Sequence, residues 1–214
     1  MNLNSVQEKS TIREDKMNFE KTIWEDIDSI HGFVVNNTEM RDQVEFIVQR
    51  IHSLLQEENA NKADLYCALG YIGYHFNHLL SVSINTIECL NKSLQFNNQL
   101  TTSWLYLGYS FFDQNDWEQS LNAFNHINPD SFNSLLLELQ LKIMELKICC
   151  KMQIDRQHNI TPEAKMFVSQ LRNANNCDKP HPTELLHIIS NADYLDFNTK
   201  EQFIQELKTS YYNI

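Results

Sequence analysis

The sequence predicts an all-α protein. After the first sixteen residues, almost every segment carries apolar side chains at the 3.6-residue spacing of an amphipathic helix. No segment shows the two-residue alternation of a half-buried strand. The 214 residues include only 4 Gly and 4 Pro. That is too few for the tight turns of an all-β fold, and a nucleotide-binding fold would need a Gly-rich phosphate loop.

The N-terminal part is expected to hold a tail and a helical pair. Residues 1–16 are polar and charged, so we expect a flexible tail there. Residues 17–60 carry two helical patterns, of which the second opens near Asn37 or Thr38. The apolar face of the first pattern is Phe19, Ile23, Ile27 and Ile30, and that of the second is Val44, Ile47, Ile51, Leu54 and Leu55. This pair is expected to serve as a cap or a degenerate repeat.

The middle part, residues 61–129, is expected to form two helical hairpins. The patterns predict helices over about 62–80, 84–96, 101–112 and 117–127. Asn128-Pro129-Asp130 then breaks the chain.

The C-terminal part, residues 130–214, is expected to pack on these hairpins. Asp130 or Ser131 is expected to cap one long helix that ends near Met152. This helix is apolar nearly all round, so other helices should cover it on several sides. Further helices are expected to start at Thr161-Pro162-Glu163, at Thr183-Glu184, and at a capping box of Asn198 and Glu201.

An internal repeat occupies the middle part. Tyr66, Leu69, Gly70, Tyr71 and Tyr74 recur 38 residues later as Trp104, Leu107, Gly108, Tyr109 and Phe112. The pattern resembles the tetratricopeptide repeat (TPR) family. The second copy matches the family pattern at Trp104, Leu107, Gly108, Phe111, Ser120 and Phe124, and the first at Tyr66, Leu69, Gly70, Thr86, Leu90, Ser93 and Leu94.

The resemblance covers roughly residues 64–129, and it has departures. In the first copy, Gly73 replaces an aromatic residue and about four extra residues separate the helices. The second copy ends early, with Ile127 at a position where a small residue is usual. We expect Gly70 and Gly108 to let the paired helix of each repeat approach closely, because a Cβ there would push it away. Ser93 and Ser120 are expected to serve the same contact from the other side.

The resemblance implies a short α-solenoid of stacked antiparallel hairpins, with capping helices at both ends. In the family, a concave face carries the binding residues. Transferred by position, they are Cys67, Tyr71, Tyr74 and His75 in the first copy and Leu105, Tyr109, Phe112 and Asp113 in the second. The Lys and Asn residues with which some family members capture a terminal carboxylate are absent. The alternative is that these aromatic residues pack against neighbouring helices, or that the C-terminal helices fill the groove.

The charge is strongly negative and unevenly distributed. The net charge is -11, and Lys62 and Lys92 are the only Lys or Arg residues between Arg50 and Lys142. Binding to nucleic acid or to an anionic membrane depends on such cations, so both are disfavoured. The acidic surface either keeps the protein soluble or attracts a partner with a basic surface.

The five cysteines show no disulfide framework, and residues 1–16 contain no apolar signal segment. Charged residues interrupt the longest apolar stretch, so no membrane span is expected. We therefore expect a soluble cytoplasmic protein. A homodimer is a further expectation, with the N-terminal helix around Trp24 as a candidate contact, although capping within the chain is the plainer alternative.

No catalytic motif stands out, and no cofactor is expected. The sequence has no phosphate-binding loop, HExxH, nucleophile elbow or CxxC. Two loose clusters have metal-ligand residue types, His75 with His78, and Cys177 with His181, Glu184 and His187. The first hypothesis is a non-enzymatic module that binds another protein or peptide on the concave face. The alternatives are a dedicated acidic chaperone or immunity-type inhibitor that masks one basic partner, and an unrecognised metalloprotein or enzyme using these clusters.

Overall fold

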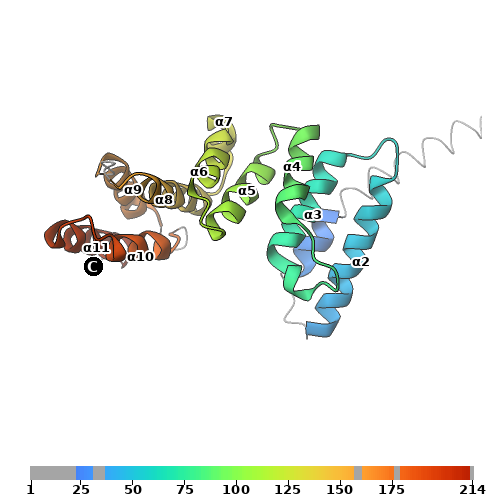
Figure 1. The fold of residues 1–214 in the computed structure, drawn as a ribbon, viewed down its shortest axis with the longest axis horizontal. Helices are drawn as coiled ribbons and strands as arrows, with labels where there is room; N and C mark the ends of the chain where they lie inside the picture. Colours follow the sequence, from blue (N-terminus) through green and yellow to red (C-terminus); the bar gives the residue numbers. More distant parts are fainter. Residues whose placement is uncertain (1–22, 31–36, 157–160, 176–178, 213–214) are drawn as a thin grey trace, which may run out of the picture. The chain divides into compact units, whose positions relative to one another are not determined.

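A computed structural model describes residues 23–30, 37–156, 161–175 and 179–212. Every regular element in these ranges is helical, which confirms the predicted all-α class (Figure 1). The chain divides into two compact units, unit 1 (Met1–Tyr106) and unit 2 (Leu107–Ile214). This division falls inside helix α5 (Thr101–Asp113), whereas the sequence suggested boundaries after residues 60 and 129.

Unit 1 is built around helix α3. It contains the helical residues 23–30, α2 (Asn37–Leu55), α3 (Lys62–Phe76), the short 3-10 helix η1 (Asn77–Leu79), α4 (Thr86–Phe96) and the first half of α5. Helix α3 packs against both α2 and α4 (Figure 1). The hydrophobic core of unit 1 includes Ile27, Val44, Ile51, Leu69 and Ile72. The proposed tail and the start of the first predicted helix lie outside the described residues.

Unit 2 is built around helix α8 (Leu137–Ile154). The other helices are α6 (Trp117–His126), α7 (Pro129–Ser134), α9 (Thr161–Asn173), α10 (Thr183–Asn191) and α11 (Phe197–Tyr212). Helices α6, α9 and α10 all pack against α8. Leu141 and Cys149 on α8 are fully buried. The expectation that other helices cover this apolar helix on several sides is therefore confirmed.

Polar N-caps explain where several helices begin. The side chains of Asn61, Asn85, Asp116 and Asn128 each accept a hydrogen bond from a backbone N–H in the first turn of the following helix. Such a bond satisfies one of the donors that a helix start leaves without an intrahelical partner.

Two helix boundaries differ from the sequence prediction. The long helix expected from Asp130 or Ser131 is broken, because Leu135 and Leu136 have extended backbones between α7 and α8. The Leu135 carbonyl left outside α8 accepts a hydrogen bond from Gln140 Nε2 at 2.8 Å. At α11, the Thr199 N–H donates to Asp196 Oδ1 at 3.0 Å, so Asp196 rather than Asn198 caps this helix.

Helices α3 and α4 form an antiparallel hairpin. The start of α3 contacts the end of α4, and the end of α3 contacts the start of α4. The Ala63 carbonyl accepts a hydrogen bond from Ser93 Oγ, whereas Gly73 lies against Thr86. A Cβ added at Gly70 would lie 2.4 Å from a methyl carbon of Leu90. Real Cβ atoms do not approach so closely, so this glycine sets the spacing of the hairpin, as the sequence suggested.

The second half of α5 and helix α6 repeat this contact in unit 2. A Cβ at Gly108 would lie 2.4 Å from Cε1 of Phe124, and Ser120 Oγ donates to the Gly108 carbonyl at 2.9 Å. Leu90 and Phe124 are matching positions of the two repeat copies. Ser93 differs from the expectation, since its hydroxyl contacts Ala63 and Ser103 instead of Gly70.

The structure accounts for both departures of the first copy. A Cβ at Gly73 would lie 2.7 Å from Thr86 Oγ1 and 3.0 Å from Cγ2 of Ile84. Ile84 belongs to the longer connection, which Asn77 holds through hydrogen bonds to both the N–H and the carbonyl of Ile84. The extra residues therefore place an apolar side chain against Gly73, and an aromatic residue at Gly73 would occupy the same space.

Candidate functional site

Three of the predicted binding residues lie together on α3. All three side chains, Tyr71, Tyr74 and His75, are half-buried, and Tyr71 and Tyr74 are each in ring contact with both His75 and Tyr106 of α5. Ring centroids lie 4.5 Å apart for Tyr71 and His75 and 4.9 Å apart for Tyr71 and Tyr106. Trp24 meets Tyr71 edge-on at 5.7 Å. We call these five residues the unit 1 aromatic cluster.

Polar tips accompany the rings of the unit 1 aromatic cluster. His75 Nε2 lies 3.3 Å from the Tyr106 hydroxyl, within hydrogen-bond distance. Burial raises the pKa of Tyr71, a hydrogen bond with Tyr106 opposes this effect, and the negative charge of Asp28 adds to it. The Tyr71 phenol is therefore neutral at physiological pH and can both donate and accept hydrogen bonds.

Sequence reasoning did not place Tyr106 in the site, and it considered Trp24 only as a dimer contact. In the repeat comparison, Tyr106 matches Ala68 of the first copy, a fully buried small residue, so the repeat gave no signal for an aromatic surface there. Trp24 lies outside the repeat. Its position on the same apolar helix as Ile23 and Ile27 is the one signal that places it near α3.

The structure buries two of the predicted binding residues, which corrects their placement on an open face. Cys67 is 1% exposed and Leu105 is 6% exposed. Burial raises the pKa of Cys67 to about 12, although a hydrogen bond with Ser103 opposes the shift. Both side chains are therefore almost fully shielded from solvent.

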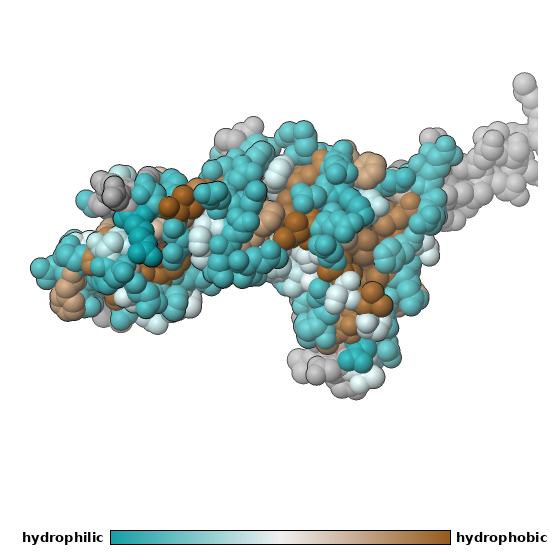
Figure 2. All heavy atoms as spheres, in the orientation of Figure 1, coloured by the Kyte–Doolittle hydropathy of each residue, from teal (hydrophilic) through white to brown (hydrophobic). Residues whose placement is uncertain are grey.

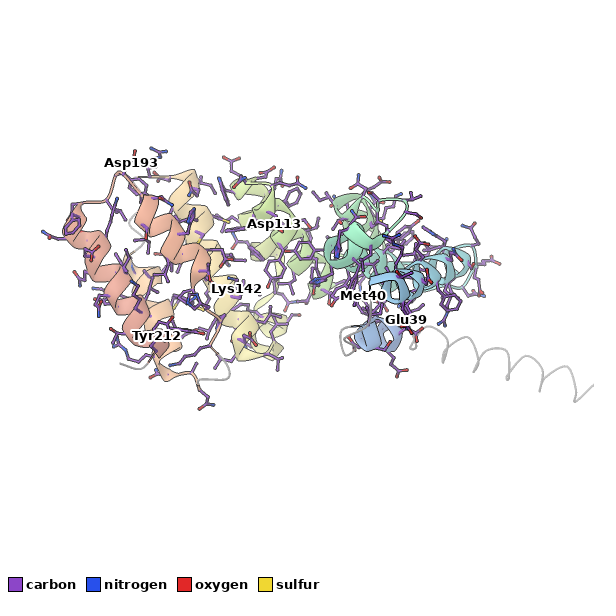
Figure 3. The ribbon with its side chains drawn as sticks, turned by 90° about the horizontal axis from the view of Figure 1, so that it is seen from below. Glu39, Met40, Asp113, Lys142, Asp193 and Tyr212 are labelled. Atoms are coloured by element: carbon purple, nitrogen blue, oxygen red, sulfur yellow. The ribbon has the colours of Figure 1, made fainter. Side chains whose placement is uncertain are left out.

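The remaining predicted residues, Tyr109, Phe112 and Asp113, belong to unit 2. Tyr109 packs edge-on against Phe124, and burial raises its pKa far above the usual range. Phe112 packs edge-on against Trp117 at 5.1 Å and against the unit 2 core. Tyr109 therefore packs against α6, and Phe112 packs against both α6 and the unit 2 core, which is the packing against neighbouring helices that the sequence left open. Asp113 is exposed at the end of α5 (Figure 3).

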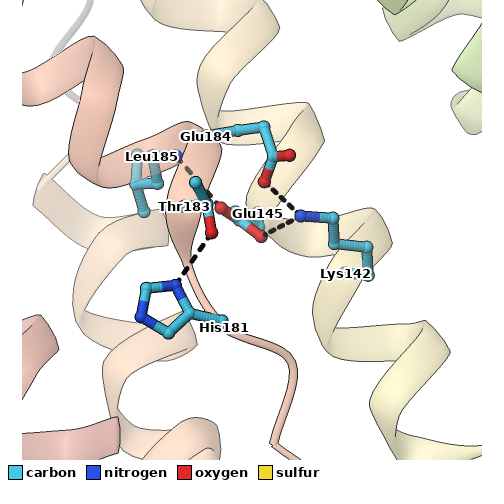
Figure 4. Close-up of polar contacts among 6 residues, drawn as sticks. All are labelled: Lys142, Glu145, His181, Thr183, Glu184 and Leu185. Carbon is cyan, nitrogen blue, oxygen red and sulfur yellow. Dashed lines mark hydrogen bonds and ion pairs between the residues drawn. The ribbon is translucent and has the colours of Figure 1, made fainter.

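A buried polar network joins α8 to α10 in unit 2 (Figure 4). Lys142 Nζ donates to Glu145 Oε2 at 2.9 Å and also to Glu184, while the Leu185 N–H donates to Glu145 Oε1 at 3.0 Å. Burial raises the pKa of Glu145 to about 7, against the effects of Lys142 and the Leu185 N–H. Burial alone would raise the pKa of Glu184, but the Lys142 ammonium outweighs it and lowers this pKa. Lys142 thus forms ion pairs with two carboxyl groups. Glu145, the more buried of the two, is protonated more readily than Glu184.

The cations of the acidic middle part lie against aromatic rings of the same unit. Lys62 Nζ is 6.0 Å from the centre of the Phe96 ring, and Lys92 Nζ is 5.7 Å from that of Tyr66. Lys92 also pairs with Glu88 at 2.7 Å. Because Lys62 and Lys92 are the only Lys or Arg residues between Arg50 and Lys142, the negative charge of this part is only weakly compensated.

Several residues of the two possible metal clusters make other contacts. His75 belongs to the unit 1 aromatic cluster, and His78 is exposed on η1. His181 bonds to the Thr183 hydroxyl and Glu184 to Lys142, while Cys177 lies outside the described residues (Figure 4). Within the described ranges, no three His, Cys, Asp or Glu side chains are grouped as metal ligands would be.

No protein-family model, curated protein or solved structure matches the chain. None of the described helices combines the length and the hydropathy that a membrane crossing requires.

Proposed function

We propose that this chain is a helical-repeat module that binds a polypeptide partner through the unit 1 aromatic cluster. The observation that supports it is the convergence of Tyr71, Tyr74 and His75 with Tyr106 and Trp24 on a half-exposed surface. Two of these rings come from outside the α3 segment that suggested the site. The TPR-like arrangement of the two hairpins is part of the proposal, and it is supported by the matching contacts of Gly70 and Gly108.

The chemistry of the cluster suits a peptide that carries Lys or Arg. Aromatic rings with polar tips combine large contact area with hydrogen bonding, and Tyr and Trp are enriched at binding hot spots. The faces of such rings attract ammonium and guanidinium groups. Asp28 lies close enough to Tyr71 to affect its pKa, so a negative charge accompanies the rings.

Selection of random peptides displayed on phage against the full-length protein tests this proposal. We expect wild-type protein to enrich Lys- or Arg-containing peptides. Tyr74→Ala should weaken their affinity at least tenfold, as for a binding hot spot. The matched control is Tyr212→Ala, which removes an exposed tyrosine at the end of α11 in unit 2 (Figure 3). Thermal melting of both variants establishes that they are folded.

Two results would contradict the proposal. One is that folded Tyr74→Ala and Tyr212→Ala bind the selected peptides equally well. The other is that the selected peptides carry no excess of basic residues.

The weakly compensated negative charge between Arg50 and Lys142 favours a second candidate, a dedicated acidic chaperone or inhibitor that masks one basic protein. Such a partner would be steered by the long-range field of the whole acidic part. Its association rate should fall steeply with salt, whereas binding dominated by the aromatic rings should change little between 50 and 500 mM salt. Association kinetics over this range, measured with the selected ligand, distinguish the two candidates.

A further inference from the structure

Unit 2 contains an apolar pocket that the proposed function does not use. It lies among α6, α7, α8 and α9 and has a volume of about 420 Å³. This is within the range of small-molecule sites. Its apolar lining comprises Phe124, Ile127, Phe132, Met144, Ile148 and Met166. Apolar residues reach the surface in patches among hydrophilic ones (Figure 2), and Met166 on α9 is 52% exposed.

Two lysines of α8 give one side of the pocket a positive charge. Lys147 and Lys151 are four residues apart, so they lie on the same helix face. Lys151 is paired with Glu163 at 2.9 Å. Within the described part of the chain, no carboxylate pairs with Lys147. The pocket therefore has one cation more than it has anions, in a protein whose net charge is -11.

The position of Lys147 is costly without a ligand. Its side chain is half-buried. Burial lowers the pKa of Lys147, and the nearby charge of Lys151 lowers it further. A bound anion would remove this cost, because an opposite charge stabilises a poorly solvated ammonium group.

We propose that this pocket binds a small amphipathic carboxylate, a medium-chain fatty acid, with its carboxylate on Lys147 and its alkyl chain against the apolar lining. One unpaired ammonium matches one carboxylate. A ligand with several phosphates would meet Glu163 at the same site, which is unfavourable. Met144 and Met166 suit an alkyl chain of variable length, because methionine side chains are flexible and polarisable.

Titration calorimetry of the full-length protein with octanoate, decanoate and dodecanoate, all below micellar concentrations, tests the alkyl part. We expect binding of one molecule per chain, tightening about fourfold for each added methylene group that is buried. Absence of binding, or affinity independent of chain length, would overturn the proposal.

Variants test the carboxylate contact. Lys147→Met should weaken decanoate binding at least tenfold and leave binding of the neutral decanol unchanged. Lys165→Met, which removes an exposed lysine of α9, should leave both unchanged. Equal decanoate affinity in Lys147→Met and wild-type protein would contradict the assignment. A short peptide that ends in leucine tests a second source of the carboxylate. If this peptide binds wild-type protein more tightly than decanoate does, and if Lys147→Met weakens its binding, the ligand is a chain terminus and the fatty-acid assignment is wrong.

Methionine methyl NMR locates the ligand. Decanoate should shift the methyl signals of Met144 and Met166 and leave that of Met40 in unit 1 unshifted (Figure 3). Shifts confined to other methionines would overturn the site. The proposed peptide site lies in unit 1 and the pocket lies in unit 2. Peptide binding by Tyr74→Ala therefore tests the proposed function, and decanoate binding by Lys147→Met tests the pocket, so either proposal can fail without the other.

Discussion

At the scale of single residues, Glu145 is the clearest case of an ionisable group that the fold buries. Its side chain is fully buried, yet it receives hydrogen bonds from Lys142 and from the Leu185 N–H. The Lys142 ammonium group also forms an ion pair with Glu184. Sequence reasoning placed Glu184 at a helix start and among candidate metal ligands, but not beside Lys142, because this partner lies about 40 positions away along the chain.

The raised pKa of Glu145 predicts a dependence of stability on pH. The pKa is about 7 in the folded protein against an ordinary 4.5. Between these values the folded state keeps a proton that the unfolded state has lost, so the free energy of unfolding falls as pH rises. The loss is nearly complete above pH 7 and amounts to about 3 kcal/mol. Glu184, with a lowered pKa, acts in the opposite sense, but below pH 4.5.

Urea denaturation at pH 5, 6, 7 and 8 measures this effect. Glu145→Gln keeps the size of the side chain and removes its titration, so its stability should change less with pH than that of the wild type. Glu201→Gln, an exposed change on α11, should keep the wild-type slope. Parallel curves for wild type and Glu145→Gln would show that Glu145 does not titrate in this window.

At the scale of elements, the two hairpins depend on close contacts at glycine. A Gly to Ala change inside an exposed helix stabilises it by about 1 kcal/mol. At Gly108 the sign should reverse, because the new Cβ would meet three ring atoms of Phe124 at 2.7 Å or less. Phe124 is 2% exposed, so the ring has little room to move. We expect Gly108→Ala to destabilise the protein by about 1–3 kcal/mol, the usual cost of overpacking.

A double-mutant cycle isolates the cause. Phe124→Leu shortens the opposing side chain and will itself cost stability through the cavity it leaves. In the double variant the added Cβ fills part of that space. The double variant should therefore lose less unfolding free energy than the sum of the losses of the two single variants. Unfolding free energies from urea denaturation of the four proteins give the coupling. Additivity within about 0.3 kcal/mol would argue against the contact.

Most of the helical elements could be predicted from apolar periodicity and polar caps, but several features could not. The break at Leu135 and Leu136 falls in a run of leucines with no Gly or Pro to mark it. Ser93 bonds across to Ser103, a contact that the repeat pattern does not encode. In the candidate site, the α3 residues followed from the repeat, whereas Tyr106 required the packing of α5, and no local pattern showed that Cys67 and Leu105 would be buried.

At the scale of the whole molecule, the residues that the structure describes form two hydrophobic cores. One is built from residues 23–79 in unit 1, around the fully buried Ile72, and the other from residues 141–207 in unit 2, around the fully buried Phe167. The boundary between the units had no sequence signal, because it lies within the uninterrupted helix α5 and not in a linker rich in Gly or Pro.

Two cores predict two units of local stability. Ile72→Ala should lower amide hydrogen-exchange protection at least tenfold in α2, α3 and α4, since a buried large-to-small change costs several kcal/mol in the unit that contains it. Protection in α8, α9 and α11 should stay within threefold of wild type. Phe167→Ala should give the reverse pattern. An equal loss of protection across both units in either variant would mean that the chain opens as one cooperative body, and the division at Tyr106 would then have no energetic meaning.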